Sequence, residues 1–134
     1  MTMYTTNYTF GVETMMTVSE ARRKIEELLK QEGFGILTEI DVQATLKKKI
    51  DVDFRPYLIL GACNPKIAHE AFGLELEIGS LLPCNVIVYQ NDKGGTNIAF
   101  MDPLIAMEST GNQGLAQHAK IVRDKLMSVA RKLE

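Results

Sequence analysis

The sequence has few cysteines, no long hydrophobic run and no excess of positive charge. Two cysteines in 134 residues cannot form the dense disulfide framework of small secreted domains. No window reaches the roughly 18 to 20 apolar residues that span a bilayer, and the polar, uncharged start from Met1 to Phe10 is unlike an export signal. We therefore expect a soluble, cytoplasmic protein that contacts no membrane and keeps both thiols reduced.

The charge balance argues against nucleic acid as a partner. There are 15 basic and 17 acidic side chains, giving a net charge of −2, so no positive field is available to collect phosphates. The longest basic run, Lys47 to Lys49, is bounded by Asp41 and Asp51. Short charged runs of this kind are usually solvated, so we interpret it as the outer face of a helix.

The rest of the composition is that of an ordinary globular protein. Hydrophobic residues make up 46% of the chain and charged residues 24%, and 134 residues is close to the commonest domain size. The sequence shows no internal repeat, low-complexity tract or linker. It therefore predicts one domain, residues 1–134, with a hydrophobic core.

Hydrophobic patterns predict five strands and two main helices. The first helix begins at a capping box formed by Thr17 and Glu20, and apolar residues then recur at helical spacing on one face as far as Gly33. The last helix, which ends near Lys132, has a similar apolar seam. The predicted strands are 4–12, 34–40, 57–63, 84–90 and 96–101, with short helices at 42–50 and 65–72 and a segment at 74–78 that favours a helical turn.

The order of these elements predicts an α+β fold. The turn formers of 91–95 predict a hairpin between the last two strands. The strand at 57–63 is almost continuously hydrophobic, which favours burial on both of its faces. We expect one mainly antiparallel five-stranded sheet covered by helices, in the order β-α-β-β-β-β-α with small helical insertions.

No motif for a catalytic centre or a cofactor is present, and we predict no cofactor. The stretch Gly33-Phe34-Gly35 lacks the third glycine and the strand-before-helix context of a dinucleotide fingerprint. There is no P-loop, zincin helix or nucleophile elbow. The sequence thus favours neither an enzyme nor a non-enzyme.

The two cysteines are candidates for chemistry, because Cys63 ends one predicted strand and Cys84 begins the next. If these strands are antiparallel neighbours, both thiols lie at one end of the sheet. The helix start after Cys63 would then favour its thiolate. One hypothesis is a reactive pair with His69 as base, and the other is a pair of inert core thiols.

The other ionisable candidates lack partners at a recognisable spacing. His69 and His118 share none of the short ligand spacings of a zinc site with the cysteines, so we predict no metal. Glu75, Glu77 and Asp102 could act as acid or base, but solvation or capping is the simpler interpretation.

Three short strings matter together: GACNP at 61–65, LPCNV at 82–86 and MDP at 101–103. Their order and spacing resemble the domain-of-unknown-function family 302, and the resemblance extends from the first helix to the last. The motif positions are Gly61, Cys63, Asn64, Pro83, Cys84, Asn85, Asp102 and Pro103.

The resemblance implies a fold like the TATA-binding-protein superfold, with a curved antiparallel sheet covered by helices. It also implies self-association, so we expect a homodimer. It implies no settled activity, and analogy to a DNA-binding superfold carries no function for a chain without positive charge.

Three hypotheses about function follow. The first, which we favour, is a binding module for a small molecule or a protein, in which Asn64, Asn85 and Asp102 hold polar groups of the ligand at one end of the sheet. The second is a thiol-based redox enzyme or sulfur carrier that uses Cys63 and Cys84. The third is that these residues satisfy only backbone groups and bind nothing.

Overall fold

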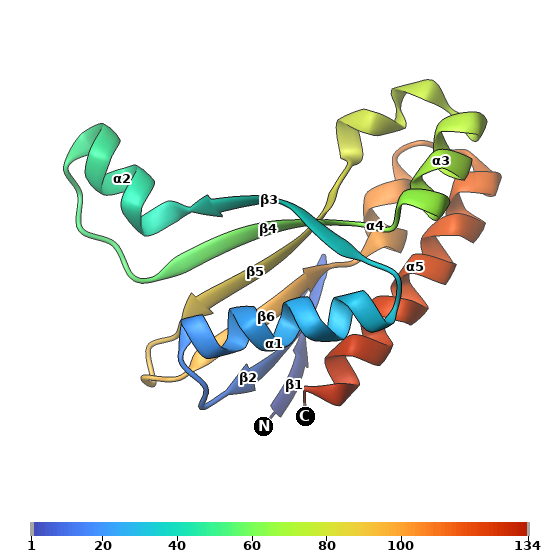
Figure 1. The fold of residues 1–134 in the computed structure, drawn as a ribbon. Helices are drawn as coiled ribbons and strands as arrows, with labels where there is room; N and C mark the ends of the chain where they lie inside the picture. The colour runs from blue at the N-terminus through green and yellow to red at the C-terminus, as the bar shows by residue number, and fades with distance from the viewer. Residues whose placement is uncertain (1, 134) are drawn as a thin grey trace.

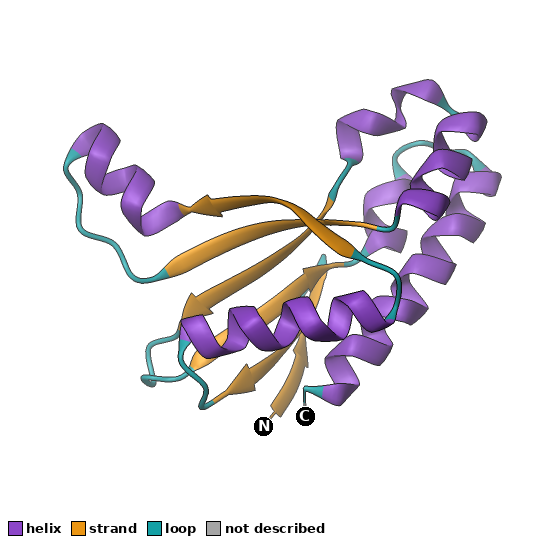
Figure 2. Cartoon of the chain, in the orientation of Figure 1, coloured by secondary structure: helices purple, strands orange, loops and turns teal. Residues whose placement is uncertain are grey.

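The computed structural model describes residues 2–133 and contains a six-stranded antiparallel sheet with two helices on one face (Figures 1 and 2). The strands lie in the order β1-β2-β6-β5-β4-β3. They are β1 (Thr2–Thr5), β2 (Thr9–Thr14), β3 (Gly35–Asp41), β4 (Tyr57–Cys63), β5 (Cys84–Gln90) and β6 (Thr96–Met101). The helices are α1 (Val18–Gln31), α2 (Val42–Ile50), α3 (Pro65–Leu74), η1 (Leu76–Leu81), α4 (Pro103–Glu108) and α5 (Gln113–Lys132).

The sheet has six strands where the sequence predicted five. The predicted strand at 4–12 is a hairpin of β1 and β2, because the chain turns at residues 6–8. The Thr6 hydroxyl holds this turn by accepting the Thr9 N–H at 3.0 Å and the Tyr8 N–H at 3.3 Å. No glycine or proline marks the turn, so the run of strand-forming residues conceals it.

Helices α1 and α5 cover one face of the sheet and enclose the main core. The predicted capping box is confirmed, since the Thr17 hydroxyl accepts the Glu20 N–H at 3.1 Å. Helix α1 buries the apolar stripe that the sequence predicted, and the C-terminal half of α5 packs beside it. The largest fully buried side chains of this core are Phe10, Val12, Ile25, Leu29, Leu60, Val86, Ile98, Phe100, Leu126 and Leu133.

A second, smaller cluster lies at one end of the sheet. The N-terminal half of α5 packs there against α3, η1 and α4. The segment that favoured a helical turn at 74–78 leads into the 3-10 helix η1, which buries Ile78. Helix α4 begins directly after Asp102.

Strand β4 shows which sheet face is covered. Leu60 and Ala62 point toward the helices and are buried, whereas Tyr57 and Ile59 lie on the opposite face and are only partly buried. The prediction that this strand is buried on both faces was wrong, because α1 and α5 pack on the other side of the sheet. We call the side that carries Tyr57 and Ile59 the open face.

Strand β3, helix α2 and the segment 51–56 extend beyond the rest of the molecule (Figure 1). No residue of α2 is buried. The basic run at 47–49 is exposed, as predicted. We call residues 35–56 the arm.

Candidate functional site

The residues singled out from the sequence gather at the end of the sheet next to the second cluster. Cys63 ends β4, and Cys84 begins β5 opposite Ala62. Asn64 follows β4, Asn85 is the second residue of β5, and Asp102 follows β6. The prediction that these residues share one end of the sheet is therefore confirmed by the strand pairing.

A small cavity lies between this end of the sheet and the helices, with a volume of about 50 Å³. Its wall is largely apolar and includes Phe34, Ile67, Ile78, Leu82, Met107 and Leu115. Cys63, Cys84, Asn64 and His118 also line it. Asn85 and His69 do not.

The environment of the two thiols disfavours the thiolate. Burial raises the pKa of the Cys63 thiol, contrary to the expectation from the helix start that follows it. Burial, with a smaller contribution from Cys63, raises the pKa of the Cys84 thiol to about 11. His69 is exposed on α3 and is not a neighbour of the cavity. These features describe core thiols better than an activated nucleophile.

Asn64 and Asp102 are occupied as helix caps. The Asn64 side-chain carbonyl accepts the Ile67 N–H at 3.3 Å, and its amide donates to the Glu32 carbonyl at 3.5 Å. One Asp102 oxygen accepts the Leu104 N–H at 3.0 Å, and the other accepts from Arg123 Nε at 3.1 Å. Both residues therefore stabilise helix starts, and their polar groups are already paired.

Asn85 lies apart from the other two motif residues. It is exposed and pairs with Gly61, so it lies on the open face of the sheet, away from the cavity. The three polar side chains thus share an end of the sheet but do not converge on one ligand position.

The remaining candidates are held on the surface. His118 bridges two helices, with Nδ1 3.1 Å from the Gly114 carbonyl and Nε2 3.0 Å from a Glu70 carboxylate oxygen. Glu77 is exposed, and Glu75 is partly exposed between α3 and η1. Within residues 2–133, no three His, Cys, Asp or Glu side chains are grouped so that they could hold a metal ion.

The open face carries a feature that the sequence reasoning missed. Cross-strand partners share a face, so the strand register defines which side chains lie together. One row crosses all six strands and is uncharged: Tyr4, Gly11, Ala99, Ile87, Ile59 and Ile40. The adjacent row is Thr2, Glu13, Asn97, Tyr89 and Tyr57.

The tyrosines of the chain gather on this face. Tyr57 stacks on Tyr89 with ring centroids 5.2 Å apart, and Phe54 at the base of the arm lies 6.2 Å from Tyr57. Burial raises the pKa of the Tyr57 phenol, and the neighbouring phenols of Tyr89 and then of Tyr8, in the turn between β1 and β2, add to this effect. The result is an aromatic surface on the side of the sheet opposite to α1 and α5.

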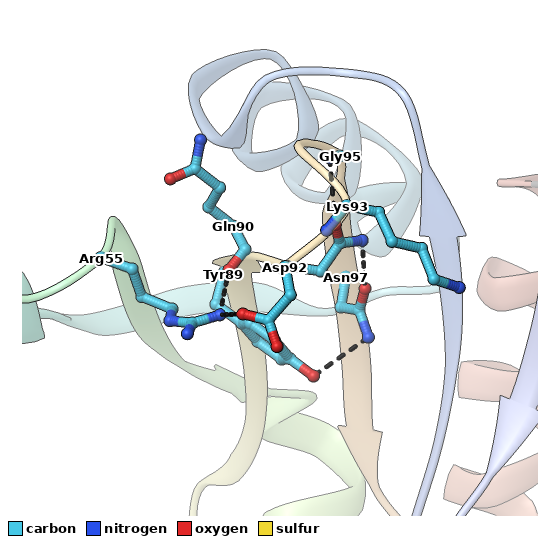
Figure 3. A network of polar contacts seen from close by, with 8 residues as sticks. Arg55, Tyr89, Gln90, Asp92, Lys93, Gly95 and Asn97 are labelled. Atoms are coloured by element: carbon cyan, nitrogen blue, oxygen red, sulfur yellow. Dashed lines mark hydrogen bonds and ion pairs between the residues drawn. The ribbon is translucent and has the colours of Figure 1, made fainter.

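A buried amide fixes two of these phenols. Asn97 donates to the Tyr89 hydroxyl at 3.0 Å, and its oxygen accepts from Asn91 Nδ2 at 2.8 Å (Figure 3). Asn97 also donates to the Tyr4 hydroxyl at 3.2 Å. Gly11 makes this possible, because a Cβ there would lie 2.7 Å from the Tyr4 ring. Burial raises the pKa of Tyr4 to about 12.

The same network continues into the hairpin between β5 and β6. The Asn91 side-chain oxygen accepts the N–H groups of Lys93 and Gly95, both at 3.0 Å. Arg55, from the end of the arm, donates to the Gln90 carbonyl at 3.0 Å and pairs with Asp92 at 2.9 Å (Figure 3). The positions of Tyr89 and Asn97 are therefore held from several sides.

Comparison with known proteins identifies the family. The model of the family described as "Domain of unknown function DUF302" matches residues 9–133. The chain belongs to the DUF302 family. The fold is also similar to the crystal structure of an uncharacterized conserved DUF302 protein from Bacillus stearothermophilus, at 30% identity and a TM-score of 0.89, over 96% of this chain and 100% of that one. No curated protein matches the chain.

Membership of DUF302 confirms the resemblance drawn from the three sequence strings, and it brings no activity with it. Among residues 2–133, no helix has the length and apolar character required to cross a membrane.

Proposed function

We propose that this DUF302 chain is a protein-binding module whose binding surface is the open face of its sheet. The observation that carries the proposal is the gathering of Tyr4, Tyr57 and Tyr89, with Ile59 and Ile87, on a face that α1 and α5 leave uncovered. Tyrosine is enriched at protein interfaces, because its ring adds apolar contact area while its hydroxyl still forms hydrogen bonds.

The fixed positions of the phenols support binding. Two hydrogen bonds from Asn97 hold Tyr4 and Tyr89, and the stacked ring of Tyr57 rests on Tyr89. Side chains that are ordered before binding lose less conformational entropy when a partner arrives. Such a surface therefore gains more affinity from the same contact area.

The charge of the open face favours a protein over nucleic acid, and the size of the cavity beside the cysteines disfavours a small-molecule site at that cavity. In the two rows described above, Glu13 is the only charged side chain, so these rows offer none of the Lys and Arg groups that nucleic acid requires, and the nearby Arg55 and Lys93 are paired with Asp92 and Glu13. Small-molecule sites usually measure about 300 to 1,000 Å³. The cavity beside the cysteines, at about 50 Å³, is far smaller.

We also propose that the fold is of the TATA-binding-protein type. Without β1 and the short helices, the element order is β-α-β-β-β-β-α, which the resemblance to the TATA-binding-protein superfold leads us to expect. One antiparallel sheet with helices on a single face supports this assignment.

A selection of peptides from a random displayed library tests the function. The protein is immobilised at low density, bound peptides are sequenced, and their dissociation constants are measured for the wild type and for Tyr57→Ala. We expect selected peptides to compete with one another and to bind Tyr57→Ala roughly tenfold or more weakly, because tyrosine is enriched among the few interface residues whose truncation costs about 2 kcal/mol or more, and about 1.4 kcal/mol already corresponds to tenfold.

The matched control is Leu76→Ala, which changes an apolar side chain that is 82% exposed on η1, away from the open face. Its affinity for the peptides should equal that of the wild type. Peptides that lose affinity with Leu76→Ala but not with Tyr57→Ala, or a library that yields no binder, would contradict the proposal.

A further inference from the structure

The tyrosine hydroxyls of the open face have protons to donate to a partner. The phenol oxygens of Tyr4 and Tyr89 each accept an N–H from Asn97, so each phenol keeps its own proton. The Tyr4 hydroxyl also faces that of Tyr89, and one proton can be shared between the two. Within residues 2–133, no side chain hydrogen-bonds the Tyr57 hydroxyl. The phenols of Tyr57 and Tyr89 therefore offer at least two donors.

The hydrogen-bond acceptors next to these phenols are already paired. The Asn97 side-chain oxygen accepts from Asn91 at 2.8 Å, and the Gln90 carbonyl accepts from Arg55 at 3.0 Å (Figure 3). The Asp92 carboxylate also pairs with Arg55, at 2.9 Å. Arg55 makes both of these contacts through Nη1, and a guanidinium has five N–H donors in all. A partner at this part of the molecule meets more free donors than free acceptors.

A hollow of about 460 Å³ adjoins the aromatic rings at the base of the arm. One of its walls is Phe54, whose ring lies 6.2 Å from that of Tyr57. The other residues that line it are Asp53, Arg55, Gln90, Asn91 and Asp92. This volume falls within the roughly 300 to 1,000 Å³ of sites that enclose a ligand. The open face therefore continues into a hollow that can receive side chains of a bound peptide.

We propose that the partner of the open face is an uncharged, proline-rich segment in the polyproline II conformation. This inference rests on the proposed function, because it names the kind of peptide that the tyrosine surface binds. Proline rings pack well on aromatic side chains, and aromatic surfaces recur as sites for such segments. Because proline has no N–H, its backbone brings only an acceptor to the interface. These carbonyls match the phenol protons of Tyr57 and Tyr89.

Other peptide conformations match the phenol protons less well. In an α-helix, most carbonyls are already bonded within the helix. An added β-strand pairs with the edge of a sheet, whereas Tyr57 and Tyr89 lie on the inner strands β4 and β5. A polyproline II segment has no internal hydrogen bonds, so its carbonyls remain available. Its preformed shape also reduces the entropy that is lost on binding.

The charged groups around this surface explain why the segment is uncharged. Arg55 pairs with Asp92 at 2.9 Å, and Lys93 pairs with Glu13 at 3.7 Å. A charged peptide would have to compete with these existing ion pairs. A neutral peptide leaves them intact and uses the aromatic rings and the phenol protons.

Isothermal titration with two uncharged peptides of equal length tests the inference. One peptide is an oligoproline of about ten residues, and the other is a flexible glycine–serine repeat. We expect the wild type to bind the oligoproline roughly tenfold or more tightly. Tyr57→Phe keeps the ring and removes one donor, so it should weaken binding about two- to tenfold. Tyr57→Ala should weaken it further, and Leu76→Ala, at an exposed position on η1, should bind like the wild type.

The peptides selected from the displayed library distinguish this inference from the proposed function. Enrichment of proline among the binders supports the inference. Binders that require Tyr57 but show no excess of proline overturn it and leave the proposed function intact. An oligoproline that does not bind the wild type at about 1 mM also overturns it, as does equal oligoproline affinity of the wild type and Tyr57→Ala. Equal affinity of the wild type and Tyr57→Phe would contradict the match between carbonyls and the Tyr57 proton.

Discussion

The two faces of the sheet are made by the same strands but carry different side chains. On the covered face, Val86, Ile98 and Phe100 are fully buried beneath the helices. On the open face, Ile59, Ile87, Tyr57 and Tyr89 occupy the alternating positions and remain partly exposed. Both faces are apolar, but the tyrosines Tyr4, Tyr57 and Tyr89, whose rings carry hydroxyl groups, lie on the open face.

Under the proposed function, this difference separates folding from binding within one sheet. Aliphatic and phenylalanine side chains without polar atoms suit a dry core, whereas tyrosine suits a surface that alternates between water and a partner. The helix-covered face therefore accounts for stability, and the open face is free to serve recognition.

The largest expected contrast comes from removing a matched isoleucine on each face. Ile98→Ala should lower the free energy of unfolding by about 2 to 5 kcal/mol, because it leaves a cavity in a fully buried site. Ile87→Ala should cost about 1 kcal/mol or less, since part of its side chain is already in water. Urea titration at low protein concentration measures both. Equal losses would show that the open face is covered within the monomer.

The two thiols offer a second contrast. With a pKa of about 11, Cys84 should react with iodoacetamide at pH 7.5 roughly a hundredfold more slowly in the folded protein than in urea. Cys63 is less buried and should react faster than Cys84, but still more slowly than when unfolded. Mass spectrometry of the alkylated peptides reports both rates. A cysteine that reacts faster when folded would support the thiol-based hypothesis instead.

Substitutions of Asp102 and Asn85 compare how much stability depends on the helix side and on the open face at one end of the sheet. Asp102→Ala should cost about 1 to 2 kcal/mol, because it removes the cap of α4 and the partner of Arg123. Asn85→Ala should change stability by less than about 0.5 kcal/mol, because Asn85 is exposed. Thermal melts of both variants test this order. Asp102→Asn serves as control, since asparagine retains the capping oxygen.

The smallest expected effect is the alkaline behaviour of Tyr4. Its folded pKa of about 12 exceeds its ordinary value of 10.0, so the folded phenol keeps its proton where the unfolded phenol has lost it. The stability that Tyr4 contributes is therefore complete below pH 10 and decreases as the pH rises toward 12. Tyr4→Phe should show a shallower loss of stability over this range in urea titrations. Identical pH profiles would mean that the Tyr4 phenol is not held on the open face.

Local signals in the sequence predicted much of the fold correctly. The capping box at Thr17 and the apolar seam ending at Leu133 lie in α1 and α5 as expected, because both depend on spacing within one helix. The turn at Thr6 was missed, because a threonine hydroxyl replaces the usual glycine or proline. Family resemblance was also predicted correctly from the strings around Cys63, Cys84 and Asp102.

The candidate site was only partly predictable. The strand order correctly placed Asn64 and Asp102 at one end of the sheet, but their pairing with Ile67 and Arg123 depends on folded geometry. The open face was missed because Ile59 lies in an almost continuous hydrophobic strand, where it cannot be distinguished from a core residue. Alternation assigns side chains to two faces, but it does not show which face the helices cover.

The most direct test of this account measures stability and peptide binding together in Tyr57→Ala. We expect binding of the selected peptides to fall roughly tenfold or more, while the free energy of unfolding changes by less than about 1 kcal/mol. A loss of several kcal/mol of stability with unchanged peptide affinity would contradict it, because Tyr57 would then belong to the fold and not to a binding surface.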